Sequence, residues 1–128
     1  KTLHCWGAND EGQIGDGTKA TRLSPVLVSG IFTEVAAGAY HTCGVTDTNQ
    51  LRCWGRNGTG RLGDGTTTDR LLPTRVALSA PVTSVAAGGY HTCGVAGTKT
   101  LCWGFNGVGQ LGNPTVTSSL EPRAVRGL

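Results

Sequence analysis

Five cysteines and three histidines carry most of the reactive side chains of this 128-residue chain. A His-Thr-Cys run at residues 41–43 recurs at residues 91–93, and Cys53 and Cys102 follow these runs in the same way. If each run pairs antiparallel with the strand that carries the later cysteine, Cys43 stands opposite Cys53 and Cys93 opposite Cys102. Directly opposite Cβ atoms lie about 4.5–5.5 Å apart, which approaches the reach of a disulfide. The spacing therefore predicts two disulfides.

Two other states of these cysteines are open on the residues alone. The thiols could be buried and free, or a metal could lie among His41, Cys43 and Cys53. One histidine and two cysteines without a fourth ligand fall short of a structural zinc site, so we expect no metal. Paired cysteines are typical of an oxidising compartment, which favours a secreted protein. The odd cysteine, Cys5, is then left unpaired.

The composition excludes several classes of protein. Gly occurs 21 times, charged residues make up 15% of the chain, and 11 Lys and Arg against 8 Asp and Glu give a net charge of +3. Helices tolerate glycine poorly, at about 1 kcal/mol each, so a helical bundle is excluded. No apolar run approaches the ~20 residues of a membrane span, and the mild charge does not indicate a nucleic-acid or membrane partner.

An internal repeat of about 50 residues organises the chain. The tripeptide Cys-Trp-Gly occurs at residues 5–7, 53–55 and 102–104. Residues 35–45 recur at residues 85–95 with one replacement, of Ala39 by Gly89. Identity over ten of eleven positions at a fixed spacing indicates a repeated structural unit.

Each repeat is expected to hold four short antiparallel strands. In the second repeat these strands are predicted at residues 33–37, 40–46, 51–55 and 73–76, with a hairpin loop at 46–50 and a long loop at 56–72. Four strands in ~50 residues are typical of one blade of a β-propeller. The third repeat is one residue shorter before its Cys-Trp-Gly, and we expect a shorter hairpin loop with Leu101 in the place of Arg52.

The repeat motifs resemble those of the regulator of chromosome condensation family. The resemblance rests on V-A-A-G-x-Y-H-T-x-x-V, then C-W-G-x-N-x-x-G-Q-L-G-D-G-T, then P-x-x-V, and it covers residues 3–125. It implies an all-β fold, a β-propeller with blades of four antiparallel strands and usually seven blades. Such a ring needs about 350 residues, so this chain is expected to supply part of it.

The repeat boundaries predict incomplete blades at both ends. Residues 1–34 hold the end of one blade and the start of the next, residues 35–84 the second repeat, and residues 85–128 an incomplete third repeat. The partner of Cys5 is expected before Lys1. We therefore interpret the chain as a piece of a larger propeller, or as a unit that assembles with other chains into a closed ring.

No catalytic constellation is found. His41 and His91 occupy equivalent repeat positions, which favours a structural hydrogen-bonding role for both. The Gly-Asp-Gly-Thr turns at Asp16 and Asp64 could be taken for calcium loops, but they lack the ligand pattern of an EF-hand, and Asp in a turn usually bonds its own backbone. The repeated tryptophans, Trp6, Trp54 and Trp103, favour packing between blades over ligand stacking.

The resemblance also implies a binding surface. A secreted bacterial branch of the family includes members that inhibit β-lactamases, and there the aromatic residues after the A-A-G corner face the bound enzyme. Tyr40 and Tyr90 match these positions, with Ala39 and Gly89 beside them. These four residues are the candidate contacts with a protein partner, although packing of both tyrosines on a neighbouring blade is the alternative.

These observations predict a secreted, non-catalytic propeller module that binds another protein through one face. The alternatives are a structural or surface-assembly repeat protein and, less favoured, an enzyme or a guanine-nucleotide exchange factor like the nuclear branch of the family. The predicted partners are a protein and the remaining blades of a ring, not a nucleic acid or a membrane, and no cofactor is expected.

Overall fold

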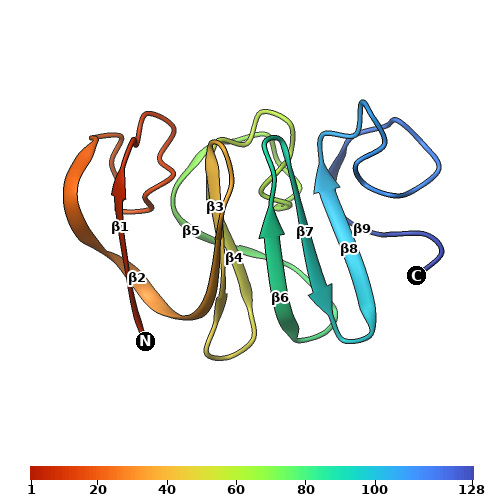
Figure 1. The fold of residues 1–128 in the computed structure, drawn as a ribbon, viewed down its shortest axis with the longest axis horizontal. Coiled ribbons are helices and arrows are strands. Elements are labelled where there is room, and N and C mark those ends of the chain that lie inside the picture. The colour runs from red at the N-terminus through yellow and green to blue at the C-terminus, as the bar shows by residue number, and fades with distance from the viewer.

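The computed structural model describes all 128 residues, which form nine antiparallel β-strands in two sheets (Figure 1). The first sheet has the order β1-β2-β3-β4-β5 and the second the order β6-β7-β8-β9. The strands are β1 (Thr2–Gly7), β2 (Arg22–Ala37), β3 (His41–Thr46), β4 (Leu51–Gly55), β5 (Arg70–Val76), β6 (Val82–Ala87), β7 (His91–Ala96), β8 (Lys99–Gly104) and β9 (Ser119–Ala124). No helix is long and apolar enough to cross a membrane.

The two sheets contain two propeller-type blades and half of another. We call β1 with residues 22–28 of β2 the half-blade, residues 31–37 of β2 with β3, β4 and β5 the middle blade, and β6–β9 the C-terminal blade. The strand β2 belongs to two of these units, because it pairs with β1 over its first half and with β3 over its second half. The all-β prediction of four-stranded antiparallel blades is confirmed.

The length of β2 differs from the prediction. A strand was expected at residues 33–37, but β2 begins at Arg22 and runs for 16 residues. In the next repeat the corresponding stretch is interrupted between Val76 and Val82, where Pro81 and two additional residues separate β5 from β6. Without that proline, the first repeat passes between blades as one strand that bends at Gly30, whose φ is 125°.

The predicted hairpin registers are confirmed. Cys43 lies opposite Cys53 between β3 and β4, and Cys93 opposite Cys102 between β7 and β8, and both pairs form disulfides. Leu101 pairs with Gly94, as Arg52 pairs with the equivalent Gly44. The hairpin loop of the third repeat is therefore one residue shorter, as predicted.

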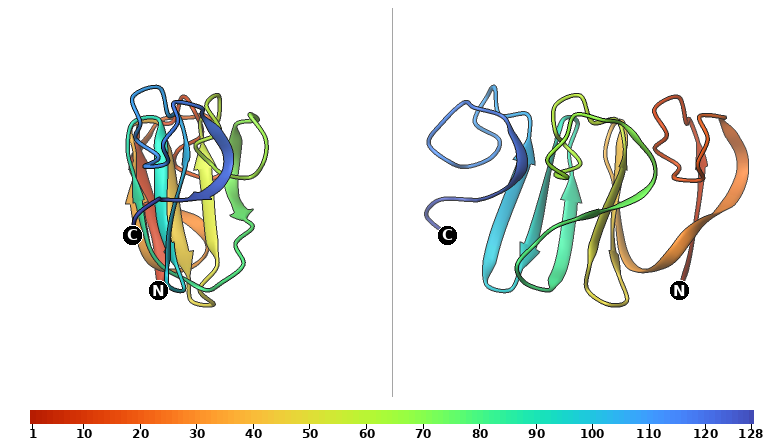
Figure 2. Two further views of the ribbon diagram at one scale, coloured as in Figure 1. Left: turned by 90° about the vertical axis from the view of Figure 1, so that its right-hand side faces the viewer. Right: turned by 180° about the vertical axis from the view of Figure 1, so that it is seen from behind.

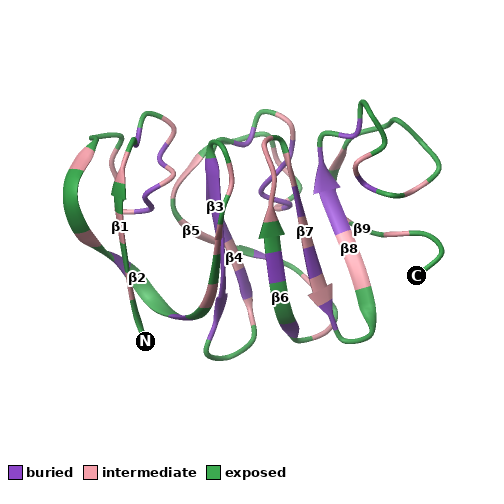
Figure 3. Cartoon of the chain, in the orientation of Figure 1, coloured by how far each residue is buried: buried purple, intermediate pink, exposed green.

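The hydrophobic core is shared by the two blades. All six residues of β3 are buried, as is nearly all of β4 (Figure 3). One core cluster joins Leu51 and Val45 of the middle blade to Val82, Val85 and Trp103 of the C-terminal blade. The blades are therefore packed face to face and do not stand as separate units.

A long loop was predicted at residues 56–72. Loop 56–69 and the equivalent loop 8–21 each lie on the blade that follows. Gly15 lies against the Trp54 indole and Gly63 against the Trp103 indole, where an added Cβ would be 2.5 Å from the ring nitrogen. We call the contact of loop 8–21 with the middle blade the first seam, and the contact of loop 56–69 with the C-terminal blade the second seam.

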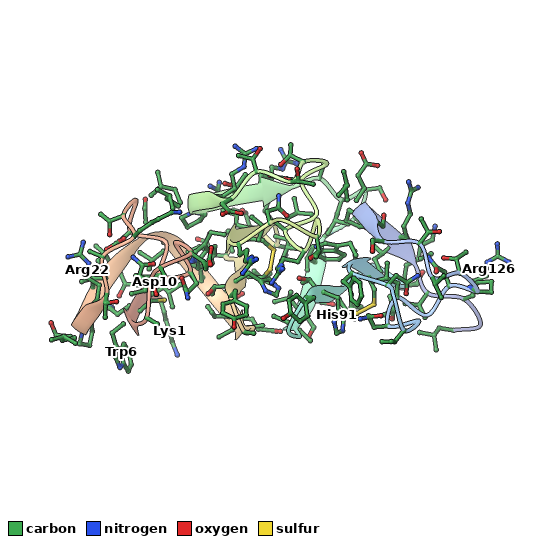
Figure 4. All side chains as sticks on the ribbon, turned by 90° about the horizontal axis from the view of Figure 1, so that it is seen from above. Lys1, Trp6, Asp10, Arg22, His91 and Arg126 are labelled. Atoms are coloured by element: carbon green, nitrogen blue, oxygen red, sulfur yellow. A yellow bond between two sulfur atoms is a disulfide. The ribbon has the colours of Figure 1, made fainter.

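Packing between blades is thus the role of two of the three tryptophans. Trp54 and Trp103 are fully buried in the seams. Trp6 has the equivalent repeat position, but it is 62% exposed and projects from the half-blade (Figure 4). Its ring has no loop of another blade over it.

The loops and corners share one edge of the molecule. The strands run between an edge that carries the long loops 8–21, 56–69 and 105–118 and an opposite edge that carries the hairpin turns (Figure 1 and Figure 2). The corners between β2 and β3 and between β6 and β7, at residues 38–40 and 88–90, lie on the side of the long loops. We call this side the loop edge.

Candidate protein-binding face at the loop edge

The two corners of the loop edge bring the predicted binding residues together. In each corner the amide of the first glycine donates to the carbonyl of the following histidine, at 2.8 Å in the middle blade and 2.9 Å in the C-terminal blade. The Ala39 amide donates to the Gly88 carbonyl at 3.3 Å, which joins the corners of adjacent blades. All four predicted residues therefore lie on one edge: Ala39, Tyr40, Gly89 and Tyr90.

Each tyrosine of the loop edge has an arginine against its ring. The guanidinium carbon of Arg56 lies 5.7 Å from the ring centre of Tyr40, and that of Arg61 lies 4.9 Å from the ring centre of Tyr90. Phe105 packs against Tyr90 in an edge-on arrangement, with 6.2 Å between ring centres. The tyrosines keep 40% and 48% of their surface exposed. Both tyrosine rings thus contact other side chains of this chain and are still partly exposed to solvent.

Three residues of this face were not predicted as binding residues. They are Arg56, Arg61 and Phe105. A signal for two of them exists in the repeat, because Arg56 and Phe105 directly follow the Cys-Trp-Gly motif, where the first repeat has Ala8. A position that varies between repeats beside an invariant motif is a candidate for specificity.

Arg61 is buried beneath the loop edge. It is 1% exposed, and its Nη1 donates to the Gly89 carbonyl at 3.0 Å. The ion pairs of the structure do not include Arg61, and its Nε has no hydrogen-bond partner. Burial and the nearby positive charge of Arg56 lower the pKa of the guanidinium. A buried cation of this kind is stabilised by the Tyr90 ring and the carbonyl dipole.

His41 links the two blades below the corners. Its Nε2 lies 2.8 Å from the Thr92 hydroxyl oxygen, and that hydroxyl donates to the Arg61 carbonyl at 2.7 Å. Because the Thr92 proton is used, His41 must donate from Nε2, and its Nδ1 has no hydrogen-bond partner. Burial, with the charges of Arg61 and His91, lowers the pKa of His41 to about 4. The structural role predicted for this histidine agrees with the contact.

Buried asparagines hold the long loops in shape, and sequence reasoning missed them. Asn9, Asn57 and Asn106 are each fully buried. The Asn57 amide nitrogen donates to the carbonyls of Thr66 and Thr68 at 2.9 and 3.0 Å, and its carbonyl accepts from Leu62 N at 3.0 Å. The signal was available, because an asparagine stands two residues after every Cys-Trp-Gly.

The Gly-Asp-Gly-Thr turns use their carboxylates internally. The Thr18 and Thr66 amides donate to Asp16 and Asp64, each at 3.0 Å, which is the bond to the own backbone that the sequence predicted. Burial raises the pKa of Asp64, but the hydrogen bonds from Thr66 and Arg70 outweigh it and leave the pKa lowered. The Arg70–Asp64 ion pair spans 2.9 Å.

In the third repeat, both partners of that ion pair are replaced by other residues. Asn113 replaces the aspartate and Ser119 stands where Arg70 stands in the second repeat. Asn113 still accepts from Asn106 and Thr115, at 3.1 and 2.8 Å. The position thus requires a hydrogen-bond acceptor and not a charge, which argues against a calcium ligand. The structure contains no cluster of three His, Cys, Asp or Glu side chains that could hold a metal ion.

Cys5 is the free cysteine of the structure. It lies on β1 opposite Val26, and it packs against a small cluster of Val28, Phe32 and Trp54. Burial raises the pKa of its thiol. Because β1 pairs with β2 alone, the sulfur has no cysteine on a neighbouring strand.

Models of known protein families match the repeats of this chain. The model described as the Regulator of chromosome condensation (RCC1) repeat matches residues 2–45 and 50–95, and a second model of the same repeat matches residues 32–61. The chain belongs to the RCC1 repeat family. The RCC1 repeat therefore accounts for the repeat length, the blades and the repeated motifs, and no curated protein sequence matches the chain.

Several solved structures share the fold. The chain is similar to Saccharomyces cerevisiae Prp20p, with 22% identity and a TM-score of 0.87 over 99% of this chain and 34% of that one. Yeast RCC1 (Prp20) bound to Kap60 gives 23% identity and a TM-score of 0.86 over 98% and 33%. Human WBSCR16 gives 23% and 0.83 over 98% and 33%. The RCC1 repeats of this chain thus span about a third of the length of these structures.

Proposed function

We propose that this chain is part of a secreted, non-catalytic RCC1-type propeller that binds another protein through its loop edge. The observation that carries the proposal is the pair of half-exposed tyrosines, each with an arginine against its ring, on adjacent corners. Aromatic residues and arginine dominate the binding energy of protein interfaces, and rigid rings lose little entropy on binding.

The residues that differ between repeats support recognition at this edge. The position after Cys-Trp-Gly is Ala8, Arg56 and Phe105 in the three repeats, whereas the buried asparagine that follows it is the same in all three. A scaffold that holds invariant positions and varies its exposed loops is the usual arrangement of a binding protein. The inhibitor-like members of the family suggest an enzyme as one class of partner.

The disulfides support the proposed compartment. Cys43–Cys53 and Cys93–Cys102 both lie within blades, where they cross-link neighbouring strands. Structural disulfides persist outside the reducing cytosol. Both disulfides therefore support an extracellular location.

A second candidate is a structural repeat protein that assembles into an array. Leu71 and Leu120 lie against Gly12 and Gly60 of the preceding loops. Leu23 has the same repeat position on β2, but it is 95% exposed. Together with Trp6, this leucine gives the half-blade an apolar surface that is suited to another blade, whether from the same chain or from a different one.

The binding proposal is tested by Tyr40→Ala with Tyr90→Ala in the disulfide-bonded protein. Extracellular proteins captured on the immobilised protein are identified by mass spectrometry, and the affinity of the recovered partner is measured by biolayer interferometry. We expect the double variant to bind over about ten-fold more weakly, because two anchors are lost.

The matched control replaces two exposed leucines of the outer strands, Leu27→Ala with Leu72→Ala, which should leave the affinity unchanged. Equal affinity of the tyrosine variant and the unmodified protein would refute the loop edge as the binding face. Ordered multimers in size-exclusion chromatography and negative-stain images, without a captured partner, would favour the assembly protein.

A further inference from the structure

We propose that Arg61 is the positioning residue of the binding face and that it makes the second seam the centre of recognition. Arg61 holds the 88–90 corner and the Tyr90 ring of the next blade in one fixed arrangement. The inference rests on the proposed function, because it assigns the rigid Tyr90 ring to the binding of the protein partner.

The equivalent residues of the other repeats show what is particular to Arg61. Gln13 and Gln110 turn back onto their own loops, where their side-chain oxygens accept from Glu11 N at 2.9 Å and from Val108 N at 3.0 Å. Arginine carries no acceptor, so it cannot make this bond. Arg61 instead crosses the second seam to the Gly89 carbonyl, at 3.0 Å.

A second residue of the same loop reaches the same tyrosine. The Thr59 hydroxyl donates to the Tyr90 carbonyl at 3.1 Å, and that carbonyl also accepts from Phe105 N at 2.9 Å. Tyr90 is therefore held at its carbonyl by two donors, at the preceding carbonyl by Arg61, and at its ring by Arg61 and Phe105. These contacts come from both blades of the seam.

The first seam holds Tyr40 less firmly. The Tyr40 carbonyl accepts from Arg56 N at 2.9 Å, which is the equivalent of the bond from Phe105 N to the Tyr90 carbonyl. Arg56 lies farther from the ring, at 5.7 Å, has 46% of its side chain exposed, and shares its charge with Glu11 at 3.5 Å. An exposed, shared cation contributes less to fixing a ring than a buried one. The two tyrosines should thus differ in mobility, with Tyr90 the more rigid.

The chain has two tyrosines, which allows a direct test. Protein labelled with 3-fluorotyrosine gives two ¹⁹F resonances, which Tyr40→Phe and Tyr90→Phe assign. Arg61→Gln introduces the residue that the other two loops carry, so we expect the fold to be kept. The Tyr90 resonance should shift and narrow as the ring is released, while the Tyr40 resonance stays. Arg75→Gln, at an exposed position of the same blade, controls for the lost charge and should move neither resonance.

Affinity for the captured partner gives the second readout. We expect Arg61→Gln to weaken binding about five-fold, because the anchor must be ordered on binding, and Arg61→Lys to restore part of it by returning a cation to the ring. An unchanged Tyr90 resonance in Arg61→Gln overturns the inference. A moved resonance with full affinity also overturns it when the double tyrosine variant is weakened. If the double tyrosine variant binds fully as well, the proposed function itself fails.

Discussion

The neutral state of His41 makes the stability of the contact between the middle and C-terminal blades depend on pH. Its ring is buried, donates to Thr92, and has a pKa of about 4 in the folded protein, against about 6.5 when unfolded. The unfolded chain therefore binds a proton at a pH where the folded chain does not, and stability is lost as the pH falls from 6.5 toward 4. We expect His41 to account for a loss of about 3 kcal/mol over this range.

Urea unfolding at a series of pH values measures this loss. His41→Gln keeps a donor for Thr92 without a titrating ring, so its stability should vary much less between pH 6.5 and 4. His4→Gln, at an exposed histidine, is the control and should reproduce the slope of the unmodified protein. The same steep slope in His41→Gln would show that another group is responsible.

Residue types alone predicted the residues of the proposed binding face, but not the contacts that hold them. The sequence placed Tyr40 and Tyr90 at equivalent corners, and the repeat also predicted both disulfides. It could not reveal the contact of Arg61 with Tyr90, because residues 61 and 90 are brought together by the packing of a loop on the next blade. A pattern within one repeat carries no information on which side chain crosses to its neighbour.

At the scale of the elements, the seams depend on glycines that admit a tryptophan ring. Gly63 has a φ of 74°, and an added Cβ would lie 2.5 Å from Trp103 Nε1. Gly63→Ala should therefore lower the free energy of unfolding by about 2–5 kcal/mol, from backbone strain and overpacking together. Thermal or urea unfolding followed by tryptophan fluorescence measures the change.

A glycine of the same loop provides the control. Gly58 has nothing within 4 Å of the position of an added Cβ and no left-handed backbone. Gly58→Ala should thus change stability by no more than about 0.5 kcal/mol. If both variants were equally stable, the close approach of loop and indole would not matter for the seam.

The strands were largely predictable and the roles of the loops were not. The strands predicted at residues 40–46 and 51–55 agree with β3 and β4 to within one residue at each end. The extension of β2 back to Arg22 was missed, because the absence of a proline break such as Pro81 is a weak signal in one sequence. A long loop was predicted at residues 56–72, but not that the glycines of loops 8–21 and 56–69 pack against the next blade.

At the scale of the whole molecule, the repeat gives each blade the same neighbours. The Thr42 hydroxyl donates to the Gln13 carbonyl across the first seam, and Thr92 donates to Arg61 across the second, both at 2.7 Å. Stability in such an array depends on each unit and on the contacts with its neighbours. A blade with a neighbour on both sides should therefore be more stable than the units at either end.

Hydrogen exchange should show this gradient along the chain. The middle blade has both seams, and every residue of β3 is buried, whereas β1 and β9 are sheet-edge strands with mainly exposed or half-buried residues. We expect the slowest amides in β3 and β4, intermediate rates in β7 and β8, and the fastest strand amides in β1 and β9, since local opening exposes the least-packed elements first. Exchange measured by NMR at constant pH resolves these strands. Uniform protection from β1 to β9 would instead mean that the blades open as one cooperative unit, and the seams would then have to be as strong as the hairpins that they join.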